Sequence, residues 1–299
     1  MTSRLDVPFA GFARLALRVP LAFAAFAAFA AFVTLASLIV ALTAASTAFA
    51  QEAPRVVDIP TRAGVTQRFL LIAPAAPKAV AVLYAGGHGG LRIAANGAFG
   101  WGRNNFLVRA RQAFVDDGVA VAIVDAPSDR LTPPYLGGFR ETPEHAADAR
   151  AVIAWLRAQP ALQQAPVWLI GTSRGTQSVA AIAVALAASG GSPDGIVLTS
   201  TILREGRANY TDKPVPDLDL GAIKIPALVV HHEDDACKLC PVADTNALMA
   251  KFTQSPRTKL MIVSGGVSQG DACEAFAHHG YNGIESEVVH AITAWMLAP

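Results

Sequence analysis

A serine flanked by glycines is the first group in this chain whose residue types and spacing could do chemistry. The run Gly-Thr-Ser-Arg-Gly at residues 171–175 follows an apolar run of strand length and precedes a helical stretch that begins at Ser178. A serine at such a junction sits on a tight, strained turn that holds its Oγ clear of the backbone. The five residues alone would also suit an ordinary turn, but the strand before them and the helix after them favour Ser173 as a nucleophile.

A serine hydroxyl is a weak nucleophile at neutral pH, so it needs a base and an acid that orients the base. Candidate acids follow the apolar run 227–230, in the sequence His-His-Glu-Asp-Asp at residues 231–235. Carboxylates at the C-terminal end of a parallel strand lie at the same sheet edge as the serine turn. We therefore expect Asp235 to be the acid, ahead of Asp234 and then Glu233. A helix-capping or solvated acidic cluster is the alternative.

One of the seven histidines is favoured as the base. His279 lies in a loop between the last apolar run and the final helical stretch, where an imidazole can reach both the acid and the serine. We expect it to serve ahead of its neighbour His278. His145 and His290 lie in predicted helices and are expected to pack there or to lie on the surface. His231 and His232 are expected to shape the site beside the acids. His88 belongs to a glycine loop.

The order of apolar and helical segments predicts the scaffold that positions these groups. Six short apolar runs have the character of strands buried on both faces, at residues 80–84, 119–124, 167–170, 195–198, 227–230 and 260–263. Longer amphipathic or alanine-rich stretches alternate with them, at residues 106–115, 144–157, 178–188, 242–252 and 284–297. This alternation predicts an α/β fold with a mostly parallel central sheet flanked by helices.

Two further segments indicate how the sheet begins and how the site is covered. Residues 55–60 and 66–72 are separated by a short turn, which predicts an antiparallel hairpin at one edge of the sheet. The insertion 203–223, which contains two prolines, is too short for a separate lid domain. We therefore expect a minimal cap.

In these motifs the chain resembles the α/β-hydrolase family. The resemblance rests on the Gly-x-Ser-x-Gly run, on Asp235 and on His279 in His-His-Gly-Tyr, in the order Ser, Asp, His that the family uses. It covers the chain from about residue 55 onward and implies a Ser-His-Asp hydrolase on the α/β-hydrolase fold. The chain departs from the family at residues 85–90, where Ala-Gly-Gly-His-Gly-Gly replaces the His-Gly that often follows the third strand.

Acyl transfer creates a negatively charged oxygen, which needs fixed N–H donors. The backbone N–H of Arg174, directly after the nucleophile, is the first expected donor. The second is expected from Gly87, or else from His88, because backbone without side chains approaches a substrate closely. Phosphate binding by this glycine loop is disfavoured, since no Gly-Lys-Ser/Thr follows it. The Arg174 guanidinium could attract an anionic substrate. We favour a structural role for it, as a partner in an ion pair or as a stacked side chain.

The segment after the predicted strand 119–124 is expected to line the substrate pocket, because it follows a strand end at the same sheet edge. Asp129 and Arg130 lie at the start of this segment, and Tyr135 offers an apolar wall. We add His278, beside the expected base, to the pocket. A plain turn and an ordinary surface aromatic are the alternatives.

Three cysteines lie close to the expected acid and base. A disulfide between Cys237 and Cys273 would tie the acid turn to the base loop and leave Cys240 free. Pairing of Cys240 with Cys273 stays open, as does a redox role for the Cys-x-x-Cys. A zinc site with His231 or His232 is disfavoured because no second Cys-x-x-Cys or regular His pair is present, so no metal or cofactor is expected.

The start of the chain has the layout of a secretory signal. An uncharged stretch at residues 21–42 follows Arg14 and Arg18 and precedes the small-x-small sequence Ala-Phe-Ala at 48–50. We expect cleavage after residue 50, which leaves residues 51–299 as one hydrolase domain in the periplasm or outside the cell. An uncleaved anchor is the alternative, because about 22 apolar residues span ~30 Å of hydrocarbon.

Composition excludes several classes of protein. With 53% hydrophobic and 16% charged residues in 299, the chain is neither disordered nor fibrous. A net charge of +1 argues against nucleic-acid binding, and no stable membrane partner is expected if the leader is cleaved. We expect an exported serine hydrolase that cleaves a small carboxylic ester or a related acyl substrate. An amidase, peptidase or thioesterase would use the same triad. The same residues would also suit a non-catalytic binding protein or a metal-dependent enzyme.

Overall fold

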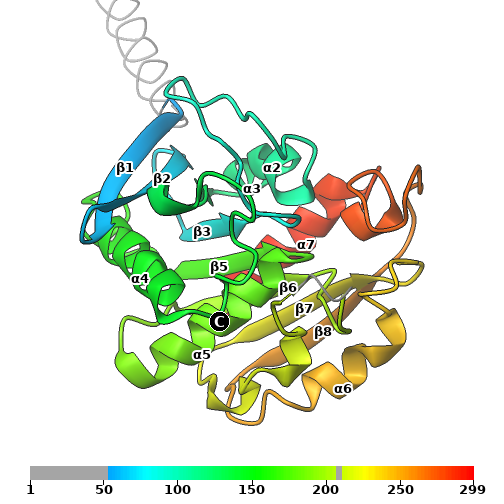
Figure 1. The fold of residues 1–299 in the computed structure, drawn as a ribbon. Coiled ribbons are helices and arrows are strands. Elements are labelled where there is room, and N and C mark those ends of the chain that lie inside the picture. Colours follow the sequence, from blue (N-terminus) through cyan, green and yellow to red (C-terminus); the bar gives the residue numbers. More distant parts are fainter. Residues whose placement is uncertain (1–52, 207–210) are drawn as a thin grey trace, which may run out of the picture. The chain divides into compact units, whose positions relative to one another are not determined.

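The computed structural model describes residues 53–206 and 211–299 (Figure 1). The predicted signal peptide, residues 1–50, lies outside these stretches, so both the leader and the domain boundary after it stay predictions. Among the described helices, none is both long and apolar enough to cross a membrane.

Eight strands of the described residues form one sheet in the order β1-β2-β4-β3-β5-β6-β7-β8. The strands are β1 (Arg55–Arg62), β2 (Val65–Ile72), β3 (Ala79–Tyr84), β4 (Val119–Val124), β5 (Val167–Thr172), β6 (Gly195–Thr199), β7 (Ala227–His232) and β8 (Thr258–Val263). The first two form an antiparallel hairpin, and β2 also pairs antiparallel with β4. All other pairings are parallel, which confirms the expected mostly parallel sheet with a hairpin at one edge.

Helices cover both faces of the sheet, so the inner strands are buried along their whole length. The helices are α2 (Phe106–Arg109), α3 (Arg111–Asp116), α4 (Pro143–Arg157), α5 (Gly175–Ser189), α6 (Thr245–Met249) and α7 (Glu285–Leu297). On one face Val82 shares a core with Ile182 of α5 and with α4, while on the other Leu83 shares a core with Ile292 of α7 and with α3. Each such buried aliphatic side chain contributes about 1.5–3 kcal/mol to folding.

Three predicted elements differ in detail from the structure. The helix expected at 106–115 is divided at Ala110 into α2 and α3, and the one expected at 242–252 consists of a 3-10 turn, η4 (Val242–Asp244), followed by α6. The prediction that β8 is buried on both faces is wrong. No described strand lies beyond it, and Ile262 on this edge strand is 45% exposed.

The carboxyl ends of the parallel strands carry the residues with expected chemistry. Ser173 follows β5, Asp235 follows β7, and His279 lies after β8 in the 3-10 turn η5 (His278–Gly280). The connection from β6 to β7 contains two more 3-10 turns, η2 (Val215–Asp217) and η3 (Leu220–Ala222), whose Val215 and Leu220 are buried in the core. The described part of this connection therefore packs on the body of the domain, in agreement with a minimal cap.

Candidate active site

The turn at Ser173 has the backbone that a strand-to-helix nucleophile turn requires. Ser173 has a φ of 52°, in the left-handed region that non-glycine residues rarely adopt, and its N–H donates to the Thr199 carbonyl at 3.0 Å. A Cβ at Gly171 would lie 2.4 Å from the Gly175 carbonyl oxygen, and one at Gly175 would lie 2.1 Å from the Tyr84 carbonyl oxygen. Both flanking positions therefore need glycine, and close packing against β3 holds the strained turn in place.

An acid and a base meet beside this turn. The Nδ1 of His279 lies 2.9 Å from the Oδ2 of Asp235, and both side chains are almost completely buried. The other oxygen of Asp235 accepts the N–H of Cys237 at 2.9 Å. A carboxylate can only accept, so Nδ1 carries the proton and Nε2 of the neutral imidazole is left with a lone pair. That Nε2 is buried and has no hydrogen-bond partner among the described residues.

Long-range hydrogen bonds hold the loop that carries His279. The Ser200 hydroxyl donates to the His279 carbonyl at 2.7 Å. Tyr281 is buried with a φ of 57°, and its hydroxyl donates to the Val230 carbonyl at 2.8 Å and accepts the Ser200 N–H at 3.0 Å. The loop is thereby fixed to the ends of β6 and β7. The sequence gives no signal for Ser200, whereas Tyr281 belongs to the His-His-Gly-Tyr motif.

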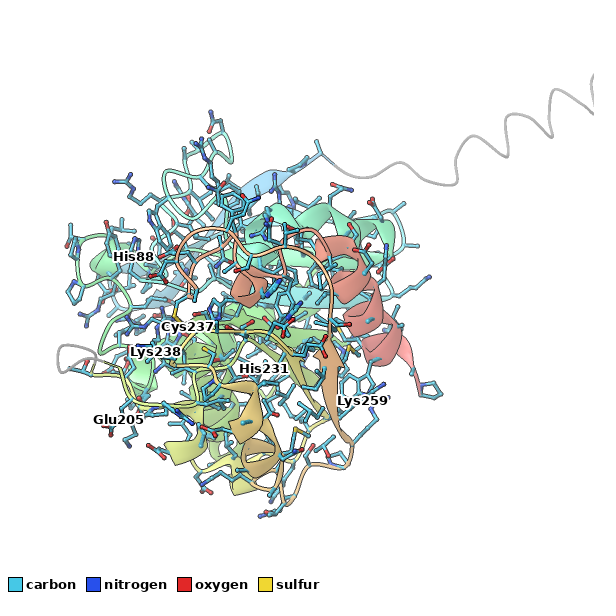
Figure 2. The ribbon with its side chains drawn as sticks, turned by 90° about the vertical axis from the view of Figure 1, so that its right-hand side faces the viewer. His88, Glu205, His231, Cys237, Lys238 and Lys259 are labelled. Carbon is cyan, nitrogen blue, oxygen red and sulfur yellow. A yellow bond between two sulfur atoms is a disulfide. The ribbon has the colours of Figure 1, made fainter. Side chains whose placement is uncertain are left out.

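A disulfide joins Cys237 to Cys273, which is the pairing that the sequence favours. It links the turn after Asp235 to the segment before His279. Cys240 is a free, buried thiol, and its burial raises the pKa of that thiol well above the ordinary value. Cys237, Lys238 and the buried His231 are labelled in Figure 2.

The two histidines that precede the acids are both engaged in structural hydrogen bonds. His231 accepts the N–H of Thr201 at 2.8 Å through Nε2, and burial lowers its pKa to about 4 although Asp235 opposes this shift. His232 accepts the Asp234 N–H at 3.0 Å through Nδ1 and donates from Nε2 to the Gly265 carbonyl at 2.7 Å. They shape the strand end that carries the acid.

Among the described residues, two groups of side chains bring metal-binding atoms together, but in each group one residue is already engaged in other bonds. In the first, Cys237, Cys240 and His279, the sulfur of Cys237 is already bonded in the disulfide. In the second, His232, Asp234 and His278, both ring nitrogens of His232 are used in the hydrogen bonds described above. Neither group offers a full set of free ligands.

The glycine loop packs directly against the nucleophile turn. A Cβ at Gly86 would lie 2.9 Å from the Cβ of Ser173, so only glycine permits this approach. Gly87 has a φ of 61° and lines the same cavity as Ser173 and His279. The loop is shaped by the buried carboxylate of Asp125, which accepts backbone N–H groups of residues 91–93 and 126 at 2.7–3.1 Å.

The structure separates the two residues expected as the second oxyanion donor. Gly87 is at the cavity, whereas His88 is not among the cavity residues. Its ring lies between Trp101, at 3.7 Å between ring centroids, and Tyr135, at 4.2 Å. Burial lowers the pKa of His88, which favours its neutral form. The geometry therefore favours Gly87.

A buried charge network supports both the glycine loop and the residue after the nucleophile. Arg174 forms an ion pair with the buried Asp212 at 2.9 Å, as favoured from the sequence. Arg140 is fully buried and donates to the Gly87 carbonyl at 2.9 Å and to the Ser178 hydroxyl at 2.7 Å. Burial lowers the pKa of Arg140 to about 9, and Arg174 adds to this effect while Asp212 opposes it. No pattern in the sequence singles out Arg140 or Asp212.

The cavity beside Ser173 has a volume of about 650 Å³, and its walls differ from the expected ones. None of the four residues expected to line it does so. Asp129 pairs with Arg62, Arg130 lies over the Phe139 ring, Tyr135 stacks on His88, and His278 stacks on His232. The loop after β4 instead supports the glycine loop from behind, since the Leu136 N–H donates to the His88 carbonyl at 3.1 Å.

The wall is built largely from residues 99–106, which are not among the residues expected from the sequence to line the site. This segment contributes three aromatic side chains, Phe99, Trp101 and Phe106, together with Arg103, Asn104 and Asn105. Ile202 and Leu239 add apolar surface from the acid side of the site. The alternation Phe-Gly-Trp-Gly at residues 99–102 is the one local signal that marks an aromatic loop here.

No protein-family model matches the chain, and no curated protein does. Solved structures do match. A dienelactone hydrolase from Anabaena variabilis superposes with a TM-score of 0.53 at 17% identity, over 82% of this chain and 97% of its own. An esterase from Pyrobaculum calidifontis gives 0.56 at 18% identity, over 83% of this chain and 86% of its own. An arylesterase superposes with a TM-score of 0.55 at 17% identity, over 82% of this chain and 83% of its own.

These neighbours share the α/β-hydrolase fold, and the order of strands and helices described above is the same architecture. The chain therefore has the α/β-hydrolase fold that its motifs predicted. At such low identity the likeness extends to the fold alone and not to the chemistry of the site.

Proposed function

We propose that this chain is a serine hydrolase that cleaves small carboxylic esters through an acyl-enzyme on Ser173. The observation that carries the proposal is the buried His279–Asp235 pair, whose free Nε2 belongs to a residue lining the same cavity as Ser173. A strained serine turn, an oriented imidazole and a glycine loop at one cavity are the parts that acyl transfer needs.

In the proposed acylation step, the Oγ of Ser173 attacks the ester carbonyl carbon while His279 takes the hydroxyl proton at Nε2. The carbonyl electron pair moves to the oxygen, where the N–H groups of Arg174 and Gly87 stabilise it. Asp235 stabilises the resulting imidazolium through Nδ1. The tetrahedral intermediate collapses when the alkoxide leaves with the proton from Nε2.

Deacylation repeats the sequence with water as the nucleophile. His279 takes a proton from water, the hydroxide attacks the acyl carbon, and the same donors hold the second oxyanion. The acid leaves as Ser173 regains its proton from the imidazolium. No redox step or group carrier is required by this chemistry.

The cavity favours compact acyl or aryl groups. Its aromatic wall gives an apolar surface for a small ester, and its volume of about 650 Å³ suits a molecule of drug-like size. Several of the structural neighbours are named esterases, which agrees with this substrate class at the level of the fold.

A panel of esters, amides and thioesters of graded acyl length tests the proposal when it is run on the wild type and on Ser173→Ala. We expect ester turnover by the wild type and a loss of about 10⁶-fold in kcat on Ser173→Ala. Preference for amides or thioesters would assign the same triad to those substrates. A folded wild type that binds acyl compounds without turnover, with the same affinity in Ser173→Ala, would identify a ligand-binding protein and refute the proposal.

We further propose that the chain is exported by cleavage of its leader, to the periplasm or the medium. The disulfide supports this location because such bonds persist in oxidising compartments. Intact-mass measurement of the protein expressed in a bacterium tests it. A mature N-terminus at Gln51 is expected, and retention of residues 1–50 would show that the leader is an anchor.

A further inference from the structure

Asn105 lies in the cavity immediately beside the nucleophile. A Cβ at Gly86 would lie 3.4 Å from the Nδ2 of Asn105 and 2.9 Å from the Cβ of Ser173. The amide nitrogen and the nucleophile thus flank the same point of the glycine loop. Asn105 and Ser173 therefore both border the part of the cavity that a substrate carbonyl attacked by Ser173 would occupy.

The orientation of the Asn105 amide is fixed by a hydrogen bond. Its Oδ1 accepts the N–H of Leu107 at 3.2 Å and caps α2, so the nitrogen end is directed away from the helix. Within the described part of the chain, Nδ2 donates to no protein group. A half-buried amide donor without a protein partner is therefore present at the cavity.

We propose that Asn105 is a side-chain oxyanion donor that acts together with the backbone N–H groups of Arg174 and Gly87. This inference rests on the proposed serine hydrolase function. When the Oγ–C bond forms, the carbonyl π pair becomes localised on oxygen, and the Nδ2–H donates to that oxygen. The hydrogen bond weakens again when the tetrahedral intermediate collapses and the carbonyl is restored. Such a donor is effective because it is stronger for the oxyanion than for the neutral carbonyl.

The surroundings of Asn105 keep this donor in place before substrate arrives. The Asn105 N–H donates to the Gly102 carbonyl at 2.9 Å. Arg109 donates to the carbonyl of Asn104 and, at 2.7 Å, to the carbonyl of Gly280. One guanidinium therefore joins the peptide that precedes Asn105 to the peptide that follows Gly280, one residue beyond His279. Preorganisation of this kind avoids reorganisation during the reaction.

Two substitutions separate the donor from the helix cap. Asn105→Ser and Asn105→Asp both keep a side-chain oxygen that can cap α2, but both lose the amide donor. Asn96→Ser is the matched control, because the Oδ1 of Asn96 likewise accepts the N–H two residues on, from Ala98 at 3.0 Å, and Asn96 lies outside the cavity.

We expect Asn105→Ser to lower kcat by about 10²-fold with little change in KM, and to weaken a boronic acid that forms a tetrahedral adduct on Ser173 by a similar factor. Asn105→Asp should lower kcat further, because its carboxylate repels the oxyanion. The Tm of Asn105→Ser should match that of Asn96→Ser. The kcat of Asn96→Ser should equal the wild-type value.

Unchanged kcat in Asn105→Ser, or a rise in KM alone, would overturn the proposal. If Asn105→Ser does not fold, kcat and KM are measured on Asn105→Asp instead and judged by the same criteria. Absence of turnover in the wild type is a different result, since it refutes the hydrolase function itself rather than the role of Asn105.

Discussion

Two loops complete the site around Ser173, and they are held in different ways. The base loop, residues 273–281, is joined to the acid turn by a disulfide and fixed to strand ends through Tyr281. The glycine loop, residues 85–90, and the residues 91–93 that follow it depend on two buried charges, the carboxylate of Asp125 and the guanidinium of Arg140. Reduction should therefore disturb the acid and base, whereas loss of a buried charge should disturb the oxyanion side.

The largest effect is expected at the acid–base pair itself. Asp235→Asn leaves the shape of the site but removes the carboxylate that orients His279, so we expect kcat to fall by about 10⁴-fold. His279→Ala removes the base itself, so we expect a loss of about 10⁶-fold, as in Ser173→Ala. Steady-state kinetics on variants with wild-type circular dichroism measure this. His278→Ala is the control, because its ring stacks on His232 outside the cavity. An equal loss in His278→Ala would show that the base is assigned to the wrong residue.

The next effect is expected below the glycine loop. Arg140→Met removes the donor to the Gly87 carbonyl and the ion pair of Arg140 with Asp212 at 3.9 Å, so that Asp212 keeps only Arg174. We therefore expect the free energy of unfolding to fall by about 3–5 kcal/mol. Arg204→Met is the matched control, because its ion pair with Asp244 is exposed to solvent and should contribute little to stability. Urea unfolding compares the two. Equal, small losses would show that Arg140 does not support the loop.

Loss of the disulfide is expected to have a smaller effect on stability. Cys237→Ser combined with Cys273→Ser should lower the free energy of unfolding by about 2–4 kcal/mol, because the bond closes a loop between residues 36 apart. Dithiothreitol should destabilise the wild type by a similar amount and leave the double variant unchanged. A wild type insensitive to the reductant in unfolding experiments would show that the base loop is held without the bond.

The smallest effect is a pH dependence that arises near the glycine loop. Burial, with a smaller contribution from Arg140, lowers the pKa of His145 to about 3 from the ordinary 6.5. The unfolded chain therefore binds the extra proton first, and stability is lost as the pH falls below 6.5, by up to about 1.4 kcal/mol per pH unit. His231, with a pKa of about 4, adds a loss of the same sign on the base side.

His145→Phe removes one of these two contributions and fits a site where the ring already contacts Tyr84 and Phe139 edge-on. We expect unfolding free energies measured from pH 7 to pH 5 to fall less steeply in this variant than in the wild type. An unchanged slope would show that His145 is not buried as a neutral imidazole.

Much of the scaffold and the candidate acid and base could be predicted from the sequence. The sheet, its antiparallel hairpin and the turn at Ser173 follow from local patterns, because apolar periodicity and paired glycines report what the backbone requires nearby. The acid and base candidates could be named because each follows a strand end. Their catalytic roles remain proposals, supported by the bond between His279 and Asp235.

The cavity wall could not be predicted in this way. Asp129, Arg130 and Tyr135 follow a strand end as well, yet their loop turns behind the glycine loop and the segment 99–106 occupies the wall instead. Arg140 and Asp212 act through contacts with residues far away in the chain. Such contacts depend on the folded arrangement of several loops, which leaves no periodic signal in the sequence.

Labelling by a fluorophosphonate probe tests the central claim most directly. Mass spectrometry of the digested protein should find one probe per chain on the peptide that contains Ser173, with labelling strongly slowed in His279→Ala. A folded wild type that stays unlabelled, or that carries the probe on another residue, would contradict the assignment of Ser173 as the nucleophile.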